Sequence, residues 1–239
     1  MWKEEIRPKT INVANKCLII DGFFLRRKCV VLIARTLEKV IYWKFYDKEN
    51  YLDWFNFLSL IYGQPLSITC DGQKGMLKAI KEVFPRTLIQ RCIFHLLLRT
   101  RQLLTMNPES LAGKELNRLI KIIPIISTKD QLDKFTKYYQ EFIFKFNSFL
   151  KEKTIIKNPI NLNKRKWFYT HSSVRSANYQ LKHNLPCFFR YLSNSSIPKT
   201  TNLLEGGINS PLQEMLHRHR GLTLDKQKVL IKIFLSSKQ

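Results

Sequence analysis

Acidic side chains are scarce in this chain: 18 Asp and Glu residues stand against 41 Lys and Arg residues among 239, and the formal net charge is +23 at pH 7. Such an excess of cations predicts a polyanionic partner, because each phosphate that a cation neutralises releases condensed counterions. The charge alone does not distinguish DNA from RNA. A hydrophobic fraction of 44%, with 12% aromatic residues, is ample for a packed core and excludes a disordered basic tail.

Long apolar runs are also missing. No stretch approaches the roughly 18 consecutive apolar residues that a membrane span needs, and the first five residues lack the apolar core of a signal peptide. We therefore expect no membrane partner and a location in the cytoplasm or at the nucleoid.

Cysteines are few and odd in number, so the sequence does not predict a disulfide framework. Cys92 and His95 have the spacing of half a zinc site, but no second Cys-x2-Cys or His-x3-His pair completes it. We therefore do not expect a structural zinc ion.

Apolar periodicity predicts an α/β fold. Residues 16–46 read as three strands joined by short turns, which implies antiparallel neighbours. The strand–helix–strand unit at residues 66–90 is long enough for a parallel crossover. We therefore expect a mixed five-stranded sheet of three antiparallel strands followed by two parallel ones. The predicted helical segments are 48–62, 74–84, 92–106, a strand-free helical stretch from 107 to about 200 with a Lys-rich loop near 151–166, and a final helix that begins near Asn202.

Three carboxylates occupy unusual settings. Asp21 interrupts an apolar strand, Asp71 ends the next apolar strand, and Glu205 precedes two glycines near the start of the final helix. A carboxylate in an apolar strand is costly unless a partner or a cation neutralises it. Ligands gather at the strand ends of open sheets, so three acids there could hold one or two Mg²⁺ ions. In a basic chain, such a site predicts metal-assisted phosphodiester chemistry.

Simpler explanations exist for two of the three acids. Asp71 could cap the helix that follows it, and Glu205 could complete a capping box with Asn202. A glycine inside the first turns of a helix costs about 1 kcal/mol relative to alanine. Gly206 and Gly207 therefore suggest that something approaches the backbone closely. A purely structural role explains Asp21 least well, because it lies in the middle of a strand among isoleucine and phenylalanine.

Five segments together resemble the catalytic core of bacterial insertion-sequence transposases related to the Mutator elements, a group of DDE transposases. They are spread from residue 18 onward, and the likeness continues to about residue 222. The resemblance implies an RNase H-like fold with a large all-helical insertion. The matching segments are Leu18–Gly22, Thr69–Ile80, Phe84–Arg86, Gln90–His95 and Thr200–Asn209.

The resemblance also implies roles for particular residues. It makes Asp21, Asp71 and Glu205 the ligands of Mg²⁺, for which Mn²⁺ could substitute, and it places Cys92 and His95 beside the active site. His95 would act near the cleaved bond as a catalytic residue. The expected DNA contacts are Lys74, Arg91, His95, Arg99, Arg175, Asn209, Arg218 and Arg220.

Two further stretches resemble parts of the same family. Trp167, Phe168 and Tyr169, together with Arg175, are similar to its aromatic and basic stretch, although a helix core flanked by solvated charge would also explain Trp167 and Phe168. The run from His217 to Leu222 resembles the family's tail. Histidines two residues apart on a helix face different directions, so this run favours phosphate contact over metal binding.

The predicted domains follow from the spacing of the acids. Asp71 and Glu205 are 134 residues apart, which is too long for a bare loop and fits a helical insertion. We expect residues 1–106 to form the first part of a catalytic domain, 107–197 the insertion, and 198–239 the helical part that carries the third acid.

The predicted function is that of a DDE transposase. Such an enzyme hydrolyses DNA phosphodiesters at the ends of an insertion sequence and joins the freed 3′-hydroxyl to target DNA, and we expect a DNA-bound homodimer in a bacterial cell. Relatives normally carry a DNA-recognition module before the first catalytic strand, where this chain has about fifteen residues. The alternative is therefore a truncated, catalytically idle DNA-binding remnant or regulator. An RNase H-like nuclease acting on RNA shares the triad but explains neither the Cys-x2-His signature nor the insertion.

Overall fold

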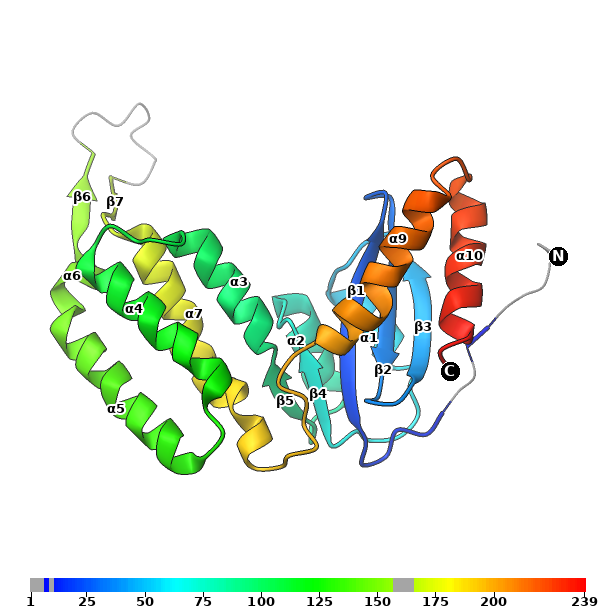
Figure 1. The fold of residues 1–239 in the computed structure, drawn as a ribbon, viewed down its shortest axis with the longest axis horizontal. Helices are drawn as coiled ribbons and strands as arrows, with labels where there is room; N and C mark the ends of the chain where they lie inside the picture. The colour runs from blue at the N-terminus through cyan, green and yellow to red at the C-terminus, as the bar shows by residue number, and fades with distance from the viewer. Residues whose placement is uncertain (1–6, 9–10, 157–165) are drawn as a thin grey trace. The chain divides into compact units, whose positions relative to one another are not determined.

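The structure is a computed structural model that describes residues 7–8, 11–156 and 166–239 (Figure 1). Its contacts divide the chain into two compact units. We call residues 1–92 with 187–239 the sheet unit, and residues 93–186 the helical unit.

The sheet unit contains a five-stranded sheet with the order β3-β2-β1-β4-β5. β1 pairs with β2 and β2 with β3 in antiparallel fashion, whereas β1 with β4 and β4 with β5 are parallel. The predicted mixed sheet is therefore confirmed. The elements of this unit are β1 (Cys17–Leu25), β2 (Cys29–Arg35), β3 (Val40–Tyr46), α1 (Tyr51–Leu58), β4 (Ser67–Cys70), α2 (Lys74–Val83), β5 (Leu88–Arg91), the 3-10 helix η2 (Arg190–Leu192), α8 (Asn202–Leu204), the π-helix η3 (Glu205–Asn209), α9 (Ser210–Arg218) and α10 (Leu224–Ser236).

Helices cover both faces of this sheet (Figure 1). Side chains alternate along a strand, so Leu18 and Ile20 of β1 face one way and Ile19 the other. The first face packs against α1 and α2, where Trp54 is fully buried. The second face packs against α9 and α10, which contribute buried residues such as Leu212. β1 is thus buried on both sides, which explains its nearly continuous apolar sequence.

The helical unit is built from amphipathic helices. Its elements are α3 (Ile93–Leu104), α4 (Leu111–Ile122), the 3-10 helix η1 (Ile123–Ile125), α5 (Lys129–Lys145), α6 (Asn147–Lys151), β6 (Lys153–Ile155), β7 (Trp167–Tyr169) and α7 (Ser172–Phe188), the last of which ends in the sheet unit. A capping box starts α5 at Thr128 and Gln131, and Phe135, Tyr139 and Phe142 form its buried stripe at helical spacing. α3 packs on α4, and α4 on α5.

The prediction of a strand-free insertion was wrong. β6 and β7 pair antiparallel, with Thr154 opposite Phe168, and Trp167 and Phe168 therefore lie in a strand and not in a helix core. Three-residue strands are too short to show a period, and the side chains of β6 are all exposed. No alternation of apolar and polar residues could reveal this hairpin. The Lys-rich loop predicted near 151–166 overlaps β6, and its residues 157–165 lie outside the described residues.

Several element ends differ from the predictions. α1 stops at Leu58, four residues before the predicted end. The final helix begins at Asn202 as predicted, but it passes through a π-helix and is followed by a separate helix, α10. The helical unit also begins and ends earlier than the predicted insertion. Helical periodicity shows which face of a helix is apolar. It shows neither the residue at which the helix ends nor the residue at which one compact unit gives way to the next.

Leu58→Ala should lower the free energy of unfolding by about 2–5 kcal/mol, because Leu58 is completely buried beneath the sheet. Leu52→Ala in the same helix is the matched control: Leu52 is 59% exposed and should change stability by at most about 0.5 kcal/mol. Urea unfolding followed by circular dichroism measures both values. Equal losses would contradict the described packing of α1.

Candidate active site

Two of the predicted acids lie level with each other on neighbouring strands. Ile19 of β1 pairs with Thr69 of the parallel strand β4. Asp21 and Asp71 each follow two residues further along. β4 ends at Cys70, so Asp71 starts the loop at the carboxyl end of that strand. The register therefore places Asp21, in the middle of β1, beside Asp71 at the carboxyl end of β4, the kind of strand end at which open sheets bind ligands.

The Asp21 side chain is held by two hydrogen bonds. The backbone N–H of Gly22 donates to Oδ1 at 2.9 Å, and the side-chain Nδ2 of Asn209 donates to Oδ2 at 3.0 Å. Asn209 is the last residue of the π-helix η3, which begins at Glu205. This bond ties the helix that carries the third acid to the strand that carries the first.

Asp71 organises the turn between β4 and α2. Its Oδ1 accepts the backbone N–H of Gln73 at 2.9 Å, and its carbonyl oxygen accepts Arg91 Nε at 3.0 Å. Gly72, with φ +83°, makes this possible: a Cβ there would stand 1.7 Å from Arg91 Nε. Asp71 therefore closes the turn before α2 but does not cap the helix, whose N-cap is Gln73 without a side-chain cap bond, and Arg91 brings a positive charge beside the same residue.

Glu205 does not complete a capping box with Asn202. The residue at the N-cap is Thr201, whose hydroxyl donates to Glu205 Oε1 at 2.7 Å. Thr201 is fully buried. Glu205 opens the π-helix, a form that is frequent at functional sites.

A buried arginine supports this helix. Arg35 is 8% exposed, and its Nη1 donates to the carbonyl of Leu203 at 2.8 Å. Burial lowers the pKa of Arg35 from its ordinary value. A Cβ at Gly207 would stand 3.3 Å from Arg35 Nη1, whereas nothing lies within 4 Å of the corresponding position at Gly206. The close approach suggested by the two glycines is therefore found at Gly207 alone.

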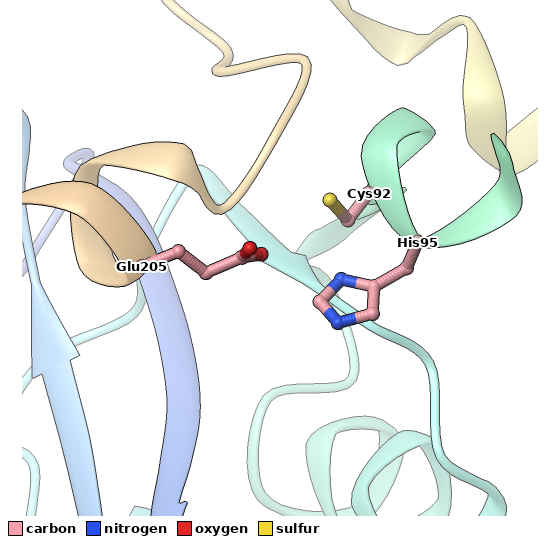
Figure 2. A group of neighbouring side chains, drawn as sticks. All are labelled: Cys92, His95 and Glu205. Atoms are coloured by element: carbon pink, nitrogen blue, oxygen red, sulfur yellow. The ribbon is translucent and has the colours of Figure 1, made fainter. Parts of the chain in front are cut away.

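Cys92 lies beside Glu205 (Figure 2). The backbone N–H of Thr201 donates to Cys92 Sγ at 3.3 Å, the Thr201 hydroxyl oxygen lies at the same distance from Sγ, and Sγ lies within 4.8 Å of the Glu205 carboxylate. Cys92 is 1% exposed. It therefore anchors the start of α8 through Thr201. His95, three residues further along, belongs to the helical unit.

Glu49 is a fourth acid at this end of the sheet. Its Oε1 accepts Trp54 Nε1 at 3.3 Å, and a Cβ at Gly22 would stand 3.1 Å from its carboxyl carbon. Burial, followed by the negative charges of Asp71 and Asp21, raises the pKa of Glu49 to about 7. The carboxylates therefore lie close enough to repel one another.

Sequence reasoning missed Glu49. It lies in the polar turn Asp47-Lys48-Glu49-Asn50 between β3 and α1, where Asn50 caps α1. Nothing in that pattern separates Glu49 from its exposed neighbours. Only the packing of its carboxyl against Gly22 does so.

The three predicted acids are not gathered around one point. Among the described residues, the oxygens of Asp21, Asp71 and Glu205 do not form a group whose members all lie within 4.8 Å of one another. The three carboxylates accept hydrogen bonds from different residues, among them Asn209, Gln73 and Thr201. The roles of these acids remain predictions.

The predicted DNA contacts fall in both units. Arg91 and Asn209 are already engaged at the two aspartates, through the bonds described above. Arg218 pairs with Glu214 on α9. Lys74 and Arg220 are exposed in the sheet unit, and Arg99 is exposed in the helical unit.

Arg175 has a structural role within the helical unit. Its guanidinium lies 3.6 Å from the centre of the Tyr169 ring, and its Nη1 donates to the carbonyl of Leu150 at 2.9 Å. Arg175 thus connects α7 to β7 and α6. Its predicted contact with DNA stays a prediction.

Comparison with known families identifies the chain. The sequence model of the family described as "Transposase, Mutator family" matches residues 29–184, more than half of the chain. The chain therefore belongs to the Mutator family of transposases. The matched range contains Asp71, Arg91, Cys92 and His95 and excludes Asp21 and Glu205. No curated protein matches the chain. Within the described residues, no helix is long and apolar enough to cross a membrane.

Gly72→Ala should destabilise the sheet unit by more than about 1 kcal/mol, because φ is +83° and the added methyl group would displace Arg91. Gly206→Ala is the control, because its Cβ would meet open space and alanine is favoured in helices by up to about 1 kcal/mol. Thermal unfolding of both variants tests this contrast. A neutral Gly72→Ala would contradict the described turn.

Glu49→Gln should change how stability depends on pH. The folded-state pKa is raised from 4.5 to about 7, so the charged form is disfavoured in the folded protein. The resulting destabilisation is absent below the unfolded pKa, grows as pH rises from 4.5, and is complete above about 7. Glutamine keeps the acceptor for Trp54 and removes the charge. Relative to the wild type, it should gain roughly 1–2 kcal/mol above pH 7, allowing for solvent screening.

Urea unfolding at several pH values between 4 and 9, in the presence of a chelator, measures this gain. The same difference between Glu49→Gln and wild type at every pH would show that Glu49 titrates normally.

Proposed function

We propose that this chain is the catalytic core of a DDE transposase with an RNase H-like fold. It would hydrolyse DNA phosphodiesters at the ends of an insertion sequence and transfer the freed 3′-hydroxyl to target DNA. The observation that supports this best is the parallel register that sets Asp21 level with Asp71. The Asn209 bond adds support by tying the helix of Glu205 to the same strand.

The donor set fits a hard divalent cation such as Mg²⁺. Asp21, Asp71 and Glu205 offer only carboxylate oxygens, which are the ligands that Mg²⁺ prefers. The negative charges of Asp71 and Asp21 both raise the pKa of Glu49, so the acids at this end of the sheet repel one another. A divalent cation would relieve that repulsion. When bound, Mg²⁺ would polarise a phosphate oxygen and lower the pKa of an attacking water or hydroxyl.

The chain's own residues would orient the acids and the DNA. Asn209 and Gln73 fix the carboxylates of Asp21 and Asp71 through single hydrogen bonds. Thr201 fixes Glu205. Arg91, held at the Asp71 carbonyl, provides a cation for a phosphate beside the metal ligands.

Double-stranded DNA is the partner in this proposal. The chain would bind both the ends of the element and the target DNA. The net charge of +23 supports binding through phosphates, with an affinity that falls steeply as salt rises. A homodimer on DNA in a bacterial cytoplasm or nucleoid belongs to the same proposal. His95 is proposed to act beside the cleaved bond.

A second function is favoured by one observation. The net charge of +23 supports DNA binding with or without cleavage, so the chain could serve as an idle DNA-binding regulator of a related transposase. It would then bind DNA with a steep salt dependence and cleave none in Mg²⁺ or Mn²⁺.

Asp71→Asn should abolish DNA nicking and strand transfer in Mg²⁺, because the amide cannot serve as an anionic ligand. Asn at position 71 can still accept the Gln73 N–H, so the fold should be kept. Nicking of a supercoiled plasmid and joining of a labelled oligonucleotide measure the two steps. Asp21→Asn and Glu205→Gln should behave in the same way.

Asp225→Asn is the matched control, because Asp225 is an exposed residue in the first turn of α10 and should leave both steps unchanged. Wild-type nicking by Asp71→Asn would refute the metal role of this residue. Binding without cleavage by the wild type would support the regulator.

A further inference from the structure

A cavity of about 260 Å³ opens in the sheet unit where the end of β1 meets α9 and α10. Its apolar wall includes Phe23, Leu25 and Leu216, of which the first two are buried. The volume is below the roughly 300–1,000 Å³ of sites that take drug-sized ligands. The cavity therefore suits one small, flat, apolar group.

A buried amide forms part of this wall. Gln227 lines the cavity and is 2% exposed, and among the described residues no group donates a hydrogen bond to its Oε1. A buried acceptor without a donor costs free energy. The terminal torsion of glutamine has a broad minimum, so the amide can turn toward a ligand at little cost. The cavity thus offers an acceptor for a ligand N–H.

The rim of the cavity is cationic. Arg26, His217 and Arg220 line it, and none of the nine described lining residues is acidic. Arg26 Nη2 donates to the carbonyls of Arg220 and Leu222 at 2.9 and 3.0 Å. These bonds hold the guanidinium in place at the turn between β1 and β2. A ligand that carries an anionic group next to its flat part fits this arrangement.

We propose that this cavity binds a single unstacked base of bound DNA. The apolar wall would pack on the base, Gln227 Oε1 would accept one of its N–H groups, and Arg26 and Arg220 would contact the flanking phosphates. The cavity would then add a base-reading site to the phosphate contacts proposed above. This inference rests on the proposed DNA binding of the chain.

Fluorescence anisotropy with three labelled duplexes tests the proposal. One duplex is fully paired, one carries a single extrahelical nucleotide, and one carries the same nucleotide without its base. All are measured without divalent cations, so that cleavage plays no part. The wild type should bind the duplex with the extrahelical base at least about fivefold more tightly than its abasic counterpart, as expected for one stacked base.

Gln227→Met should weaken that preference at least about twofold, because the acceptor for the base N–H is lost while the apolar wall remains, and should leave the affinity for the fully paired duplex unchanged. Methionine keeps the length of the side chain but removes the buried oxygen, so the melting temperature of the free protein should stay the same or rise. Gln140→Met, at an exposed position of α5, is the matched control and should keep the preference.

Equal wild-type affinity for the base and abasic duplexes overturns the proposal. A cavity that is filled by a side chain of a second copy of the chain would give this result. A lower melting temperature for Gln227→Met also overturns it, because the amide would then be structural. Failure to bind any of the three duplexes would instead contradict the proposed DNA function.

Discussion

The pairing of β1 with β4 is the constraint on which the site depends. Ile19 lies opposite Thr69, so Asp21 and Asp71 arrive at the same level of the sheet. A register shift of one residue would turn Asp21 toward the face of α1 and α2, among fully apolar side chains. The buried strands on both sides of β1 prevent such a shift, because every apolar side chain would change face with it. Core packing and site geometry are therefore set by the same pairing.

Hydrogen bonds from several different elements hold the carboxylates in position. Asn209 and Gln73 hold the aspartates through hydrogen bonds, and Thr201, itself in contact with Cys92, holds Glu205. Arg35, buried beneath the start of this helix, fixes the Leu203 carbonyl. Cys92 thus has a physical role here, since its thiol contacts the threonine that holds Glu205.

Much of the fold was predictable because the apolar pattern is strong where the sheet is buried. The three antiparallel strands, the two parallel strands and the start of the last helix were predicted from period and turn residues alone. The hairpin of β6 and β7 was not, because exposed three-residue strands carry no period. Asp21 and Asp71 were found from their apolar contexts, whereas Glu49 was missed because its turn looks like an ordinary solvated loop.

The sequence by itself determined the mixed sheet, the membership in a transposase family and the acids worth testing, because buried strands and family motifs are local patterns. Only the tertiary structure decided how those acids are held. The Asn209 bond to Asp21 joins residues 188 positions apart, and the Glu49 carboxyl reaches the aspartates by packing against Gly22. The cavity at Gln227 likewise needs β1, α9 and α10 together. Contacts between distant segments have no local pattern, so they follow from packing alone.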